Sequence, residues 1–209
     1  MGGNGTCDRL NELTSVRAMT LAAVSPLSQS QLDFSPRPGR WSIGEVADHL
    51  LLAEREYRDE IQRLIALARA GKTPYLKRSF ADANVSPLFL PNAVLSALEV
   101  PFSIVGRFVP DALRGAITEI PILPTRNPDF STPRAHRRAD AIKADLAASI
   151  QKTRDLIATN VDLDLSKLVS EHPLMGRTNV PQILTFLARH ERRHQGQMER
   201  VRAVKGFPQ

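Results

Sequence analysis

Cysteine, aromatic residues and long apolar runs are all scarce in this chain of 209 residues. A single cysteine, Cys7, excludes an internal disulfide and a zinc cluster built on several cysteines, and it fits a reducing compartment. The low aromatic content of 5% and the shortage of β-branched runs favour helices over strands. No stretch approaches the roughly 20 apolar residues of a transmembrane helix, and the N-terminus lacks the layout of a signal peptide. We therefore expect an all-α, cytoplasmic protein without a membrane partner.

Basic residues outnumber acidic ones, giving a formal net charge of +6 and an isoelectric point near 10.0. Such a charge raises nucleic acid as a partner. However, the basic residues are scattered along the chain, and no aromatic residues interleave with the arginines near the C-terminus. We expect no nucleic-acid partner. The length is that of one domain, residues 1–209, with room for an insertion.

Apolar residues recur at helical spacing in four long segments, which predicts helices over 8–24, 42–70, 137–160 and 180–204. The second begins with Ser42 and Glu45 at the spacing of a capping box, and Gly71 ends it. Thr178 or Asn179 can cap the last helix, with Pro181 in its first turn.

Residues 71–135 hold nine of the fifteen prolines, which forbids long helices there. The segment is also rich in apolar residues, so it must pack against something. It could form an extra layer over the helices, a homodimer interface, a lid over a hydrophobic substrate pocket, or a surface that touches membrane.

The most informative motif is the pair His190 and His194 in the last predicted helix. Residues four apart lie about 40° apart around a helix, so both rings share one face and can bind one ion. That face is the apolar stripe of Ile183, Phe186, Leu187 and Val201. Two buried imidazoles side by side would repel each other if protonated, and a shared cation solves this problem.

His49 lies at the edge of the apolar stripe of the second predicted helix. A lone histidine there is usually a hydrogen-bonded core residue, but the pair His190 and His194 needs a third ligand, and we predict His49 in that role. His172 lies in a turn before the last helix, from which it could reach a metal or substrate, although a partly exposed turn residue is the simpler reading. His136 is expected at the surface.

The string from His190 to His194 also matches the His-Glu-x-x-His motif of zincin proteases, in which the glutamate is the general base. That mechanism needs a third ligand further downstream. Arg200 stands where a histidine would be required, and Glu199 faces away, so we do not favour a zincin protease over the readings that follow.

Two stretches together carry a family resemblance: Trp-Ser-Ile-Gly-Glu-Val-Ala-Asp-His at 41–49 and His-Glu-Arg-Arg-His-Gln-Gly-Gln at 190–197. The chain resembles the DinB-like superfamily. This resemblance implies an up-and-down four-helix bundle that holds a divalent metal through His49, His190 and His194. The Pro-rich insertion at 71–135, between the second and third bundle helices, is long for that family.

Three neutral imidazoles leave coordination positions open, as in catalytic metal sites. Zinc or nickel suits them, and iron is a further candidate. The ion would activate a water or thiol, with Glu191, Glu45 or Glu56 as general base or supporting partner. Gln197 could orient a ligand or only complete a core hydrogen bond.

Two functional classes stay open at this stage. The resemblance implies a hydrolase or a transferase that adds a low-molecular-weight thiol to a small-molecule substrate. The alternative is a non-catalytic helical bundle whose helices are held together by the metal and which serves for binding or as a scaffold.

Overall fold

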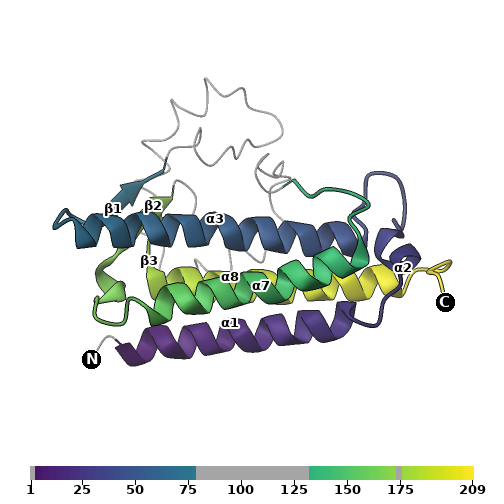
Figure 1. The fold of residues 1–209 in the computed structure, drawn as a ribbon. Helices are drawn as coiled ribbons and strands as arrows, with labels where there is room; N and C mark the ends of the chain where they lie inside the picture. The colour runs from purple at the N-terminus through teal and green to yellow at the C-terminus, as the bar shows by residue number, and fades with distance from the viewer. Residues whose placement is uncertain (1–2, 79–131, 173–175) are drawn as a thin grey trace, which may run out of the picture.

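The computed structural model describes residues 3–78, 132–172 and 176–209, and this part of the chain is mostly helical. Four long helices run alongside one another (Figure 1). They are α1 (Gly3–Val24), α3 (Ile43–Arg69), α7 (Ala139–Ala158) and α8 (Val180–Arg202). They confirm the four predicted helices, with shifts of a few residues at the ends. A short helix that was not predicted, α2 (Gln29–Asp33), connects α1 to α3.

The ends of α3 and α8 follow the predicted capping chemistry. The Ser42 hydroxyl accepts a hydrogen bond from the Glu45 amide at 3.2 Å, and the Glu45 carboxylate accepts one from the Ser42 amide at 2.8 Å. Asn179 caps α8 in the same reciprocal way with Gln182. At the other end of α3, Gly71 takes a φ of +67°, which glycine adopts without strain. The sequence therefore sets the start and the end of the helix that carries His49.

A small sheet, which the sequence analysis did not predict, closes one end of the helices (Figure 1). Strand β1 (Tyr75–Lys77) runs parallel to β2 (Val169–His172), and β2 pairs antiparallel with β3 (Gly176–Asn179). A turn of 3-10 helix, η2 (Leu165–Lys167), precedes β2. Strands of three or four residues are too short to show an alternating pattern. Of the turn predicted at 172–176, residues 173–175 lie outside the described residues, and its two end residues, His172 and Gly176, belong to β2 and β3.

The buried apolar side chains form two clusters, one towards each end of the long helices. The first includes Leu13, Ile61, Leu184 and Ile157, and the second includes Val24, Val46, Leu146 and Met198. Between them along the helices lies a band of buried polar residues: Arg17, Thr20, Glu54, Arg58, Ser149, Thr153 and Glu191. The core is therefore apolar at both ends and charged in its middle.

Residues 79–131, most of the predicted Pro-rich insertion, lie outside the described residues, as do the layer, lid and interface predicted for them. The chain on either side of them is bound to α3. Arg78 donates to Glu60 at 2.8 Å and to Glu56 at 2.6 Å. Arg134 and Arg137 both donate to the fully buried Asp48. Among the described helices, none combines the length and the apolar character needed to cross a bilayer.

Candidate metal centre

The structure brings together the three histidines that were predicted as metal ligands. His49 projects from the first half of α3, and His190 and His194 project from successive turns of α8. The Nε2 atom of His190 lies 3.2 Å from Nε2 of His49 and 3.2 Å from Nε2 of His194. One ring nitrogen from each residue falls within 4.8 Å of the other two. The same nitrogen type of each ring therefore points at a common centre.

Both the distances between the Nε2 atoms and the number of protons that these atoms can carry fit a bound metal ion. Two imidazole nitrogens bound to one tetrahedral zinc lie about 3.3 Å apart, because each Zn–N bond is about 2.05 Å long. The measured separations of 3.2 Å agree with that value. A neutral Nε2 carries either one proton or one lone pair, so Nε2 of His190 can satisfy only one of its two neighbours by hydrogen bonding. A central cation would accept all three lone pairs.

Gln197 holds one of these rings in the form that a metal requires. Its Oε1 accepts a hydrogen bond from Nδ1–H of His194 at 2.8 Å. With the proton on Nδ1, Nε2 of the neutral ring presents its lone pair to the centre. Of the two roles predicted for Gln197, the orientation of a ligand is the one that this contact supports.

Burial keeps the rings of His190 and His194 neutral. Desolvation, followed by the charges of His194 and His49, places the pKa of His190 well below its usual value. Desolvation is also the main reason why the pKa of His194 falls to about 4, with His49 as the next cause. Neutral imidazole is the form that binds a metal, so at neutral pH these ligands need not lose a proton first.

Aromatic rings flank the cluster on two sides. The indole of Trp41 lies 4.9 Å from the ring of His49 and 6.5 Å from the ring of His194, between centroids. Phe186 stacks on His190 at 5.6 Å. Trp41 was noted in the sequence only as part of the family motif, and Phe186 only as a core residue. Both displace water from the imidazoles and so contribute to the desolvation.

The two carboxylates predicted to act in catalysis occupy different environments. Glu45 is half-buried one turn before His49 on α3, and its Oε2 accepts the capping bond from Ser42. Glu191 is buried, and both of its oxygens accept hydrogen bonds from Arg17, at 2.7 and 3.1 Å. Thr20 donates a further bond to Glu191 at 2.6 Å. Glu56, the further candidate, forms an ion pair with Arg78.

The two remaining histidines lie outside the cluster. His172 is half-buried at the end of β2, where it pairs with Gly176, and it is not one of the three grouped ligands. Desolvation, with the charge of Arg78 as the second cause, lowers the pKa of His172 to about 4. His136 is at the surface as predicted, with 77% of its side chain exposed.

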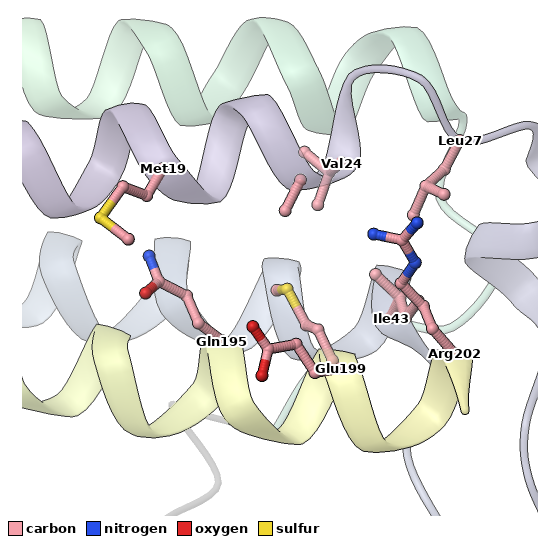
Figure 2. A pocket seen from close by; sticks show the side chains of 9 residues that line it. Met19, Val24, Leu27, Ile43, Gln195, Glu199 and Arg202 are labelled. Carbon is pink, nitrogen blue, oxygen red and sulfur yellow. The ribbon is translucent and has the colours of Figure 1, made fainter. Parts of the chain in front are cut away.

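A cavity of about 100 Å³ opens between α1 and α8, and Figure 2 shows the side chains around it. Its walls are mainly apolar, from Met19, Val24, Leu27 and Ile43, and Glu199 and Arg202 also line it. None of the three clustered histidines lines this cavity. It is therefore distinct from the candidate metal centre.

Three convergent imidazoles on a mostly helical scaffold define the class: a helical protein with a three-histidine group that could hold a metal ion. A sequence model of the DinB superfamily matches residues 12–198, which is most of the chain. The chain belongs to the DinB superfamily, and this confirms the resemblance of its two histidine motifs. No curated protein and no solved structure matches the chain.

Proposed function

We propose that the protein is a metal-dependent enzyme of the DinB superfamily, which uses a divalent ion on His49, His190 and His194 to activate a water or a thiol. The reaction would be hydrolysis or the transfer of a low-molecular-weight thiol to a small electrophile. Zinc or nickel is the proposed ion, with iron as a further candidate. The observation that carries this proposal is the convergence of three Nε2 atoms from two helices.

The rest of the proposal extends the sequence predictions. We propose an up-and-down four-helix bundle made of α1, α3, α7 and α8 in a single domain, with residues 71–135 inserted between α3 and α7. A cytoplasmic location and a homodimer remain part of the proposal. The single cysteine supports the location.

His49, His190 and His194 would hold the ion and leave one of its coordination positions to water or a thiol, whose pKa would be lowered so that it could act as the nucleophile. The chain itself orients and desolvates this position. Gln197 holds the ring of His194, and Trp41 and Phe186 limit access of water to the rings.

Glu45 is the carboxylate that we propose as the proton acceptor. It lies one helical turn from His49 on the same face of α3. Only Oε2 is used by the capping bond, and within the described residues Oε1 accepts no hydrogen bond. Glu191 is less suited to this role because Arg17 and Thr20 already bind its oxygens.

The alternative is a non-catalytic protein in which the metal joins α3 to α8 and serves stability alone. One observation favours it: the cavity of Figure 2 is not lined by the histidines. In that case the ion would be coordinatively closed and would exchange no ligand with solvent.

Elemental analysis of the purified protein tests the metal centre first. We expect about one zinc, nickel or iron per chain in the wild type, and none in His194→Ala. His136→Ala, at the exposed histidine, is the control and should keep the metal. The proposal would be refuted if the wild type takes up no metal and its melting temperature is unchanged by a chelator.

A second experiment distinguishes the enzyme from the non-catalytic scaffold. In thiol-transfer and ester-hydrolysis assays, Glu45→Gln should lower the rate by about 10²-fold or more while metal content stays unchanged. The amide oxygen of glutamine can still accept the hydrogen bond from the Ser42 amide, so the start of α3 is preserved. Metal-loaded protein without any such activity, and without an exchangeable water on the ion, would favour the scaffold.

A further inference from the structure

The centre of the helical core contains an arginine with almost no access to solvent. Arg17 on α1 is 1% exposed. Its Nε and Nη2 donate to Glu191 on α8, and its Nη1 donates to Glu54 on α3 at 2.9 Å and to the carbonyl of Leu146 on α7 at 3.0 Å. One guanidinium thus binds the three other long helices at once.

The two carboxylates that Arg17 binds belong to the helices that carry the histidines. Glu54 follows His49 by five residues on α3, and Glu191 is the residue directly after His190 on α8. Because a helix is stiff over such distances, the Glu54–Arg17–Glu191 bridge constrains how far α3 and α8 can move apart, and therefore how far His49 lies from His190.

The bridge is well supported on all sides. Thr153 donates to the second oxygen of Glu54 at 2.7 Å, and Thr20 donates to Glu191 at 2.6 Å. Burial alone would lower the pKa of Arg17, but the charges of Glu54 and Glu191 raise it. A fully satisfied buried network of this kind holds one geometry, since any shift leaves a charge without its partner.

We propose that Arg17, Glu54 and Glu191 are positioning residues for the metal centre: they fix the separation of α3 and α8 at which the three Nε2 atoms meet. This inference rests on the proposed metal site, and it gives Glu191 a role that differs from general-base catalysis. A general base would affect the rate alone. A positioning residue affects the affinity for the metal.

The test compares variants with the wild type in two measurements. The first is zinc affinity, determined by competition with a chelator, and the second is the visible absorption spectrum of bound Co²⁺. We expect Glu54→Gln and Glu191→Gln each to weaken zinc binding about 10-fold to 100-fold and to change the cobalt spectrum. The effect should appear in both variants because each removes one arm of the same bridge.

Glu60 provides the matched control. It is also a buried carboxylate on α3, but it accepts its hydrogen bond from Arg78, at 2.8 Å, and has no part in the bridge to α8. Glu60→Gln, the same change on the same helix, should lower the melting temperature and leave the zinc affinity of the folded protein within about two-fold of wild type. If Glu60→Gln weakened zinc binding as much as Glu54→Gln does, the loss would be a general effect of destabilisation and the proposal would be wrong.

A triple variant covers the case in which single changes prevent folding. Arg17→Met with Glu54→Gln and Glu191→Gln removes the three charges of the bridge together, so that none of the three is left without its partner. Arg58, which lies 3.9 Å from Glu54, keeps its hydrogen bonds to Ser149 and Thr153. We expect it to fold, as judged by circular dichroism, and to bind zinc weakly. Wild-type affinity in this variant would overturn the positioning role alone, whereas a wild type that binds no metal would overturn the proposed function and this inference with it.

Discussion

At the scale of single residues, Gln197 controls the candidate site through one hydrogen bond to Nδ1 of His194. Without this acceptor the ring can turn or move its proton to Nε2, where it blocks the lone pair. Gln197→Leu should therefore weaken zinc binding about 10-fold to 100-fold in a chelator-competition titration.

Gln197→Glu is the matched control, because a carboxylate accepts the same hydrogen bond and raises the basicity of the ring. It should bind zinc at least as tightly as the wild type. Equal affinities for the leucine and glutamate variants would show that the hydrogen bond does not orient His194.

At the scale of elements, the start of α3 depends on a close contact with α2. A Cβ atom on Gly44 would lie 3.0 Å from the carbonyl oxygen of Leu32, a backbone atom that cannot turn away. Gly44→Ala should lower the free energy of unfolding by about 1 kcal/mol, because the overpacking outweighs the gain in helix propensity. Urea denaturation of the metal-free protein measures this change.

Gly196 on α8 is the control for that substitution. Among the residues that the structure describes, a Cβ there would meet only Nη1 of Arg200, at an ordinary 3.6 Å. Gly196→Ala should therefore stabilise the protein by about 0.5–1 kcal/mol through helix propensity alone. A gain of the same size from Gly44→Ala would mean that α2 moves aside without cost.

The elements also show which structural features a sequence can reveal. The helices were predictable because apolar stripes and capping residues such as Ser42 and Asn179 are local signals. The strands of the small sheet were not, since three or four residues carry no periodicity.

Some residues of the candidate site could likewise be predicted from the sequence, and others could not. His190 and His194 can be predicted from their spacing. His49 can be predicted from the third ligand that this pair needs and from the family motif. Arg17 gave no sign of its burial, because its partners Glu54 and Glu191 are 37 and 174 residues away and an arginine in an amphipathic helix reads as a surface residue.

At the scale of the whole molecule, stability should depend on pH through His172. Its pKa is about 4 in the folded protein and about 6.5 in the unfolded chain. Between these values the unfolded chain binds more protons, so the free energy of unfolding falls as the pH drops from about 6.5 to about 4. Between pH 7 and pH 5 we expect His172 to contribute a loss of up to about 2 kcal/mol.

Urea unfolding of the metal-free wild type and of the metal-free His172→Gln variant, each at pH 7 and pH 5, isolates this contribution. The variant should lose less stability than the wild type over the same interval. The full loss in the variant would show that His172 exchanges no protons on unfolding and that the pH dependence arises elsewhere.

The ion pairs on either side of residues 79–131 have a consequence for how this chain can vary. Arg78 is tied to Glu56 and Glu60, and Arg134 is tied to Asp48, so both anchor points lie on α3. The two ends of any sequence placed between these anchors are therefore fixed to α3, whatever its length. For a protein engineer who exchanges this segment, the natural places to join the new sequence are after Arg78 and before Arg134.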